Sequence, residues 1–329
     1  KTIYLDNAAT TTVDPRVFQA MRPFFIEKFG NPSSLYTAGM EANGAVNDSR
    51  RKIAEILHAM PDNIIFTSGG TESDNLAIFG VARSNPPSQG GTRGVLAKRH
   101  IITTQIEHHA ILSPLHALEQ QGWSITYLPV DKAGLVNPND VIQAIRPQTV
   151  LISIMYANNE IGTVEPIAEI GKQLLHYRKE NKTVYPYFHT DACQATGLLD
   201  LDVEKLHVDL MTINGSKIYG PKGIGALYVR RGVKIEPIIY GGQQERHVRA
   251  GTENVPGIVG LGKALELVQK NKDKESARLK KLAEYFINKL KLIPDCKLNG
   301  PELENNRLVN NVSVTFNGVE GEALVIYLN

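Results

Sequence analysis

Lys217 is the residue of this chain with the clearest chemical potential. It lies between two apolar runs, residues 210–213 and 224–229, and follows Gly215 and Ser216. This pattern predicts a strand, a loop and a second strand. A lysine in a partly desolvated site loses its proton more readily, and a neutral amine can form a Schiff base with a carbonyl cofactor such as pyridoxal phosphate. Taken alone, the stretch fits a surface lysine at a strand end better than a Schiff-base lysine. The choice between the two therefore depends on the other residues that could share the site.

A glycine and hydroxyl loop follows the apolar run at residues 64–67. Its residues are Ser68, Gly69, Gly70 and Thr71, directly before a predicted helix. The free backbone N–H groups of a helix start bind phosphate well, which makes Gly70 and Thr71 candidate ligands. The alternative is a plain helix cap by Ser68 or Thr71. The spacing matches neither a Walker A loop nor a dinucleotide fingerprint.

Asp191 follows the predicted strand at residues 187–190. The carboxyl edge of a parallel sheet is where such folds bind ligands. An ion pair between Asp191 and a pyridine nitrogen would be worth about 4 kcal/mol at an intermediate dielectric, or about three pKa units. A ring kept protonated in this way is the electron sink that carbanion chemistry needs. The alternative is an aspartate that caps a helix.

Three further groups of polar residues lie in loops. His108 could stack on a planar ring and shuttle protons, and the amide of Asn159 could bind a ring hydroxyl. Residues 249–252 combine a cation, a glycine and the hydroxyl of Thr252, as an anion clamp would. The plain alternatives are an exposed histidine, a turn and a loop with a surface arginine. The histidines lack metal-ligand spacing, so no metal is predicted.

Alternating strands and helices must position these residues. Strands are predicted at residues 3–5, 64–67, 101–104, 124–128, 150–155, 187–190, 210–213 and 224–229. Helices are predicted at residues 14–28, 41–57, 72–82, 110–121, 138–145 and 167–177, and a mobile loop at 85–94. The alternation indicates an α/β fold with a mainly parallel sheet covered by helices. The candidate residues at 70–71, 108, 159, 191 and 217 each follow one of its strands.

The pattern changes after Thr252. Helices are predicted at residues 259–268, 279–290 and 320–328, and a strand at 309–316, which together indicate a smaller α+β domain. The lysines between the first two helices are interpreted as a solvated face. We expect a large domain at residues 16–258 and a small domain formed by residues 1–15 and 259–329.

Composition excludes several classes of protein. The chain has 329 residues and a net charge of +2, with acids and bases mixed, which gives no electrostatic footprint for nucleic acid. No apolar run reaches membrane-spanning length, and the first residues lack the apolar core of a signal peptide. Two cysteines, Cys193 and Cys296, form neither a disulfide framework nor a zinc site. They fit a reducing compartment, so a cytoplasmic location is expected.

The motifs together resemble a known family. YLDNAATT, GNPSS, SGGTESDN, EHHAIL, NNEIGTVEPI, HTDACQA, KIYGPKGIGALYVRR and RAGTEN occur in that order along nearly the whole chain. In these motifs the sequence resembles the cysteine desulfurases of the NifS/IscS type, which are class V aminotransferase relatives of pyridoxal-phosphate fold type I. The resemblance implies a mainly parallel, seven-stranded type of sheet with helices on both faces.

The resemblance also implies roles for matching residues. Lys217 would form the Schiff base and move the substrate α-proton, with His108 stacking on the ring and assisting. Asp191 would pair with the pyridine nitrogen. Asn159 and Gln194 would contact the ring hydroxyl, and Gly70, Thr71 and Ser216 would hold the phosphate. Thr252 would reach the phosphate of the neighbouring subunit, which implies a homodimer.

The chain departs from the family in two places. Many members have histidine just before the lysine and serine two residues earlier, where this chain has Ser216 and Asn214. The family's nucleophilic cysteine and its carboxylate-binding arginine lie beyond the equivalent of residues 324–328, so we expect both to be missing from these 329 residues. Cys193 should lie near the ring nitrogen as a small buried residue, and Cys296, among turn-like residues, matches no family site.

The resemblance therefore implies a cysteine desulfurase. It would convert L-cysteine to alanine and an enzyme persulfide and pass the sulfur to an acceptor protein, for iron–sulfur cluster assembly or tRNA thiolation. Two alternatives remain open at this point: a non-catalytic, cofactor-binding partner subunit, and another pyridoxal-phosphate enzyme such as an aminotransferase or a selenocysteine lyase. No direct contact with nucleic acid or membrane is expected.

Overall fold

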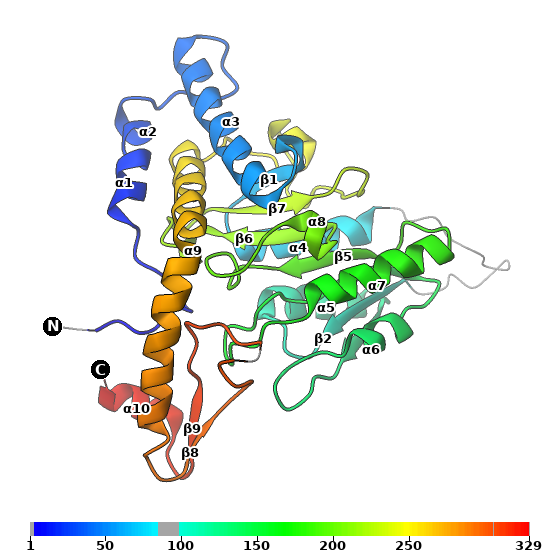
Figure 1. Cartoon of the computed structure of the whole chain (residues 1–329). Coiled ribbons are helices and arrows are strands. Elements are labelled where there is room, and N and C mark those ends of the chain that lie inside the picture. Colours follow the sequence, from blue (N-terminus) through cyan, green and yellow to red (C-terminus); the bar gives the residue numbers. More distant parts are fainter. Residues whose placement is uncertain (1–2, 85–98, 305, 329) are drawn as a thin grey trace.

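A computed structural model describes residues 3–84, 99–304 and 306–328 of the chain. Within these ranges a seven-stranded sheet forms the centre of the molecule (Figure 1). Its strands are β1 (Ile64–Thr67), β2 (His100–Thr104), β3 (Ser124–Leu128), β4 (Thr149–Ser153), β5 (Tyr187–Asp191), β6 (Leu210–Asn214) and β7 (Gly225–Val229). The predicted loop at residues 85–94 lies outside the described residues.

The strand order is β1-β7-β6-β5-β4-β2-β3. All neighbours pair in parallel except β7, which is antiparallel to both β1 and β6. Six strands therefore run in one direction and β7 runs against them. The α/β class with a mainly parallel sheet is confirmed, and the loops that leave β1, β2, β4, β5 and β6 all meet at one edge.

Helices cover both faces of this sheet. The α-helices of the described residues are α1 (Pro15–Met21), α2 (Pro23–Ile26), α3 (Thr37–Leu57), α4 (Gly70–Arg83), α5 (His109–Gln120), α6 (Pro138–Gln143), α7 (Ile167–Glu180), α8 (Val203–Leu206), α9 (Val255–Leu290) and α10 (Gly321–Leu328), of which α2 and α10 bury no residue. Helices α4 and α5 share one apolar core with alternate sheet residues such as Ile65 and Ile101. Helices α3, α6, α7, α8 and the first part of α9 share the other core with Ile64 and Ile102.

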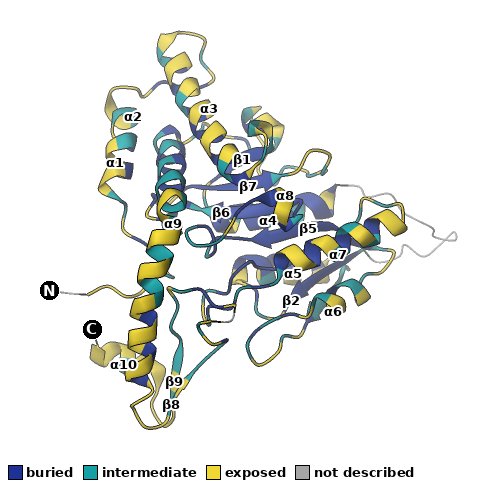
Figure 2. Ribbon diagram, viewed as in Figure 1, coloured by how far each residue is buried: buried dark blue, intermediate teal, exposed yellow. Residues whose placement is uncertain are grey.

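The alternation of side chains along each strand explains the two cores. Ile64 and Phe66 face the core beneath α3 and α9, whereas Ile65 between them faces the core beneath α4. All four residues of β1 are buried, as are all five of β2, β4 and β5. Strands buried along their whole length are typical of a sheet covered on both faces, and Figure 2 shows the buried strands between more exposed helices.

Several predicted elements are wrong in extent. Residues 3–5 form no strand, and the helix predicted at residues 14–28 is divided into α1 and α2 at Pro23. The strand predicted at residues 309–316 is confined to β9 (Val314–Phe316), which pairs with β8 (Cys296–Leu298), an element that the sequence did not predict. Cys296 thus lies in a strand and not among turn residues.

Helix α9 is one continuous helix of 36 residues where the sequence predicted two. In Figure 1 it runs from the sheet to the β8–β9 pair. Its buried residues end at Leu265 and resume at Ala283. The predicted domain boundary after residue 258 falls inside this helix, and the two-domain division stays a proposal.

Candidate active site

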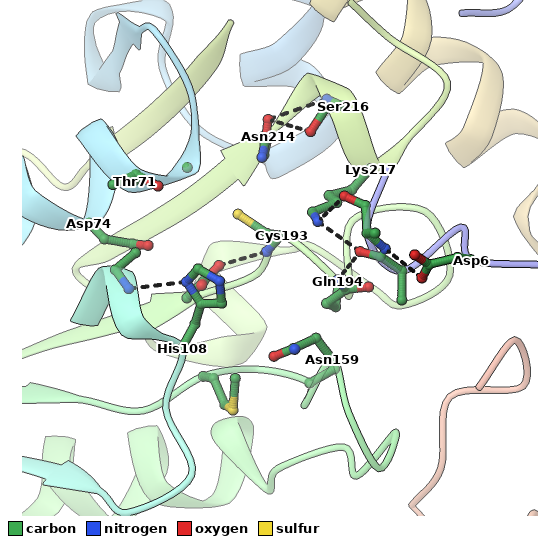
Figure 3. Close-up of a pocket in the computed structure, with 17 residues that line it drawn as sticks. Asp6, Thr71, Asp74, His108, Asn159, Cys193, Gln194, Asn214, Ser216 and Lys217 are labelled. Carbon is green, nitrogen blue, oxygen red and sulfur yellow. Dashed lines mark hydrogen bonds between the residues drawn. The ribbon is translucent and has the colours of Figure 1, made fainter. Parts of the chain in front are cut away.

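A cavity of about 390 Å³ lies at the edge where the parallel strands end. It is lined by Asp6, Ala8, Ala9, Gly70, Thr71, Asp74, His108, Ala110, Met155, Ala157, Asn159, Asp191, Cys193, Gln194, Asn214, Ser216 and Lys217. Eight of the nine predicted site residues are in this set, and Figure 3 shows their side chains around the space. The ninth, Thr252, is exposed and lies outside the lining.

The amine of Lys217 is held at one side of the cavity. The residue follows β6 in a short 3-10 turn (Gly215–Lys217). Its Nζ donates hydrogen bonds to the carbonyl oxygens of Ala8, at 2.7 Å, and Ala9, at 2.6 Å. Gln194 donates its amide N–H to the same Ala8 oxygen at 2.9 Å. The N-terminal segment thus forms a wall of the cavity, a role that sequence reasoning did not assign to it.

The backbone and the hydroxyl of Thr11 fix that N-terminal segment. Thr11 donates from its backbone N–H and from its hydroxyl to the carbonyl of Ser216, at 2.9 and 3.0 Å. The same hydroxyl accepts from the backbone N–H of Tyr219 at 2.8 Å. These bonds join residues more than 200 positions apart, so the pairing of the two segments depends on the tertiary fold.

Asp191 ends β5 and is buried. Its Oδ1 accepts a hydrogen bond from the backbone N–H of Cys193 at 2.9 Å. Burial, and then the neighbouring carboxylate of Asp191, raise the pKa of the Cys193 thiol well above its ordinary value. Cys193 therefore remains a thiol, which agrees with the interpretation of a small buried residue.

The glycine loop approaches the cavity closely. Helix α4 begins at Gly70, so the backbone N–H groups of Gly70 and Thr71 precede the first intrahelical bonds. A Cβ at Gly70 would lie 2.8 Å from the sulfur of Cys193. Glycine is thus required at this position by packing, and the helix start presents N–H groups to the space beside it. Such a helix start suits an anionic group such as a phosphate.

The two departures from the family motif contact each other. Asn214 accepts hydrogen bonds at its Oδ1 from the backbone N–H of Ser216, at 3.2 Å, and from its hydroxyl, at 3.3 Å. Asn214 thereby caps the turn that carries Lys217. The serine hydroxyl remains at the cavity, next to the start of α4 in the lining.

His108 and Asn159 complete the opposite side. His108 caps α5, because its Nδ1 accepts from the backbone N–H of Ala110 at 3.0 Å, and its ring borders the cavity. Asn159 follows β4, and its carbonyl accepts from the side chain of Asn311 at 3.2 Å. The C-terminal part of the chain therefore supports the Asn159 loop.

The predicted anion clamp has a different partner. Arg249 forms an ion pair with Glu72 in the first turn of α4, with nitrogen–oxygen distances of 2.8 and 3.2 Å. Burial of Glu72 opposes this pair, yet the hydrogen bonds from Arg249 and Ser68 lower the pKa of Glu72 overall. The guanidinium thus fastens the loop of residues 249–252 to α4.

Comparison with known proteins places this site in a family. Residues 3–329 match the family model described as aminotransferase class-V, so the chain belongs to that family. It is 52% identical over 328 residues to a protein named cysteine desulfurase IscS from Dictyoglomus turgidum, covering 99% of this chain and 79% of that one. It is 51% identical over 329 residues to a protein of the same name from Methanosarcina thermophila, covering 100% and 77%.

Solved structures agree with this fold. A structure titled NifS-like protein matches with a TM-score of 0.91 and 38% identity, covering 98% of this chain and 84% of that one. A structure titled SspA in complex with cysteine matches with a TM-score of 0.82 and 38% identity, covering 99% and 86%. The pyridoxal-phosphate fold type I is therefore confirmed, and pyridoxal phosphate is the cofactor of this family.

The residues present fit this cofactor. A lysine amine, a buried carboxylate, a helix start with a tightly packed glycine and a histidine ring border one cavity. These groups match a carbonyl, a ring nitrogen, a phosphate and the face of an aromatic ring, respectively. Among the described residues no group of histidine, cysteine, aspartate or glutamate has the geometry of a metal site. No helix in the described ranges is long and apolar enough to cross a membrane.

Proposed function

We propose that this protein is a pyridoxal-phosphate-dependent cysteine desulfurase. The observation that carries the proposal is the convergence of Lys217 and Asp191 on one cavity in a chain half identical, over its whole length, to proteins named cysteine desulfurase. The net reaction moves the sulfur of L-cysteine to a cysteine thiolate, giving alanine and a persulfide. When bound, pyridoxal phosphate supplies a carbonyl that condenses with amines and a ring that accepts electrons.

The chain's own groups divide the remaining tasks. Lys217 would hold the cofactor by its amine and would move the proton at the substrate α-carbon. Its present acceptors, the carbonyl oxygens of Ala8 and Ala9, keep the amine at the cavity. His108, which lines the cavity, would stack on the ring of the cofactor and assist proton transfer.

Polar groups orient the cofactor. Asp191 pairs with the ring nitrogen, and Asn159 and Gln194 face the ring hydroxyl. The backbone N–H groups of Gly70 and Thr71 and the hydroxyl of Ser216 hold the phosphate. These assignments are supported by the common lining of the cavity.

Neither cysteine of these 329 residues is placed to receive the sulfur. Cys193 is buried beside Asp191, and burial raises the pKa of its thiol well above the ordinary value, so it does not supply a thiolate. Cys296 is in β8 and is not part of the cavity lining. Alternative functions as an aminotransferase or a selenocysteine lyase are less well supported, because relatives that are 52%, 51% and 48% identical to this chain carry the desulfurase name.

Several finer assignments belong to the same proposal. The enzyme works as a cytoplasmic homodimer, with Thr252 of each subunit reaching the phosphate bound by its partner. A sulfur-acceptor protein receives the persulfide sulfur, for iron–sulfur cluster assembly or tRNA thiolation. The relatives' name IscS supports the first of these destinations.

The decisive experiment measures sulfide release from L-cysteine in the presence of a reductant. We expect the natural full-length protein to release sulfide and the Lys217→Ala variant to lose the activity and the absorbance of the bound cofactor. Sulfide release by Lys217→Ala at the wild-type rate would refute the assignment. Amino-group transfer from cysteine to a keto acid would support an aminotransferase instead.

A further inference from the structure

Asp74 is a buried acid at the cavity that the proposed chemistry does not use. It lies in the second turn of α4, is 1% exposed and lines the cavity beside Asp191. Its Oδ1 is buried without a hydrogen-bond partner among the described residues. A hydrogen bond with the Thr212 side chain favours the charged form of Asp74, but burial outweighs it. Burying an ionised carboxylate with one oxygen unpartnered is expensive, so the protonation state of Asp74 needs an explanation.

The groups that face Asp74 are mostly acidic. Asp191 lies at the end of β5, and Glu107 lies in the loop before α5. Glu107 is 6% exposed; its Oε1 accepts from the Thr104 hydroxyl, at 2.8 Å, and from the backbone N–H of Met155, at 2.9 Å. Its Oε2, like the Oδ1 of Asp74, is buried and unpartnered in the part of the chain that the structure describes.

His189 of β5 is the basic side chain nearest to Asp74. Its Nε2 lies 3.7 Å from the Oδ1 of Asp74, which is beyond hydrogen-bond distance. The two ring nitrogens instead contact the hydroxyls of Ser153, at 2.9 Å, and Thr212, at 3.1 Å. Burial lowers the pKa of His189 to about 3, so the ring is neutral at pH 7 and does not compensate a charge on Asp74.

Across the cavity, the cationic group is the amine of Lys217. Its hydrogen bonds go to the carbonyls of Ala8 and Ala9, and the ion pairs found among the described residues join no lysine or arginine to Asp74 or Asp191. Cys193, the other titratable neighbour, remains a thiol. Two ionised carboxylates in this wall would therefore repel each other without a cation to stabilise them.

We propose that Asp74 is a positioning residue that remains a neutral carboxylic acid, so that Asp191 alone presents a negative charge to the ring nitrogen of the cofactor. Glu107 remains neutral in the same wall. Burial, and then the charge of Asp191, raise the pKa of Asp74 well above its ordinary value, and burial raises the pKa of Glu107 to about 8. Carboxylic acids kept neutral by an apolar site serve as hydrogen-bond donors in other active sites.

The positioning role of Asp74 rests on the proposed function only in so far as it concerns the contact between Asp191 and the ring nitrogen of the cofactor. The proton on Asp74 is a property of the protein wall and exists whether or not the protein releases sulfide. A single ionised carboxylate gives the ring nitrogen one defined partner, whereas a second charge on Asp74 would compete for the same proton. Figure 3 shows Asp74 on the side of the cavity opposite Lys217.

Infrared spectroscopy of the cofactor-free protein at pH 7 tests the proton directly. We expect a C=O stretching band of a protonated carboxyl group in the wild-type spectrum, moving to lower frequency in D2O. Asp74→Asn should remove one component of this band and Glu107→Gln another. Asp273→Asn, which changes an exposed acid on α9, should remove none. A wild-type spectrum without the band would overturn the proposal. This outcome does not depend on whether any of the variants folds.

The pH dependence of the bound cofactor's absorbance tests the positioning. Asp74→Asn keeps a neutral hydrogen-bond donor of the same shape. The absorbance of the cofactor bound to this variant should therefore change at the same pH as in the wild-type protein. Asp74→Ala removes the donor, so the change in cofactor absorbance should occur at a different pH in this variant. Equal displacement in both variants would overturn the role of a neutral Asp74. A protein that shows the infrared band but releases no sulfide would refute the proposed function and leave the neutral Asp74 standing.

Discussion

At Gly70 the packing beside the cavity leaves no room for one additional carbon atom. A Cβ there would lie 2.8 Å from the sulfur of Cys193 and 3.4 Å from the Nδ2 of Asn214. We expect Gly70→Ala to destabilise the protein by about 1–3 kcal/mol, as overpacking does elsewhere, and to weaken cofactor binding. Urea denaturation measures the first effect, and titration with pyridoxal phosphate measures the second.

Two variants control this prediction. In Gly44→Ala the added methyl group meets nothing within 4 Å and lies within α3, so we expect stabilisation by about 0.5–1 kcal/mol. In the double variant Gly70→Ala with Cys193→Ala the obstructing sulfur is gone, and part of the lost affinity should return. Additive losses in the double variant would show that the sulfur is not the cause.

At the scale of residues, the sequence predicts the groups that directly follow strands. Lys217, Asp191, His108 and Asn159 could be found because each lies at the end of a predicted strand or in the loop that follows it. Asp74 was not found, although an acid within the apolar stripe of α4 is itself unusual. The Ala8 and Ala9 carbonyls could not be found, because backbone acceptors carry no side-chain signal and their contact depends on the tertiary fold.

The strands and helices of the sheet region were predictable for a different reason. The buried strand β1 has the predicted bounds, because its apolar run ends where burial ends. Strand β3 also has the predicted bounds, although most of its residues are only partly buried. The middle of α9 is far less buried, so it lacks the apolar repeat that marked its two ends. Lysine and glutamate favour a helix without burial, and the ion pair between Arg278 and Glu275 adds to this.

A buried ion pair joins α3 to the loop that carries Thr252. Glu245 accepts from both terminal nitrogens of Arg50, at 2.6 and 2.9 Å, and from the backbone N–H of Phe66 at 2.9 Å. Removal of one buried partner leaves the other charge uncompensated, so we expect Glu245→Ala to cost about 3–5 kcal/mol of unfolding free energy. Urea denaturation provides the measurement.

The neighbouring pair of Arg246 and Asp62 is the matched control. The side chain of Asp62 is 89% exposed, so Asp62→Asn should change the stability by less than about 1 kcal/mol. Similar losses in Asp62→Asn and Glu245→Ala would contradict the claim that burial gives the Arg50–Glu245 pair its importance.

For the molecule as a whole, buried acids make the stability depend on pH. Burial raises the pKa of Glu107 to about 8 and that of Glu165 to about 7. The folded protein thus holds protons that the unfolded chain has released above its ordinary carboxyl pKa of 4.5, and stability falls as pH rises through this window. The lowered pKa values of His100 and His189 act in the opposite sense, but only below about pH 6.5.

We therefore expect the unfolding free energy to decrease between pH 6.5 and 8, with each such acid contributing a slope of up to about 1.4 kcal/mol per pH unit. Glu107→Gln should flatten the decrease, because its amide does not titrate. Urea denaturation at several pH values checks this. A wild-type stability that is constant or rises over this range would contradict the raised pKa of Glu107.

The proposed homodimer has its own test at this scale. Thr252 is exposed and outside the cavity of its own chain, as a residue that serves a partner's site would be. If each site combines Lys217 of one subunit with Thr252 of the other, Lys217→Ala and Thr252→Ala subunits should restore activity when mixed and reassembled. Sedimentation should show a dimer, and mixtures no more active than Thr252→Ala alone would speak against a shared site.

The reversed direction of β7 has a geometric consequence for the site. Because β7 lies between β1 and β6, the glycine loop and the lysine turn are two strand spacings apart, or about 10 Å. At this edge β7 contributes its first residue, Gly225, whose missing side chain leaves room for the backbone of Gly69. Strand β7 thus sets the distance between the glycine loop and the lysine turn. Anyone transplanting this site to another scaffold would have to copy that distance before copying any side chain.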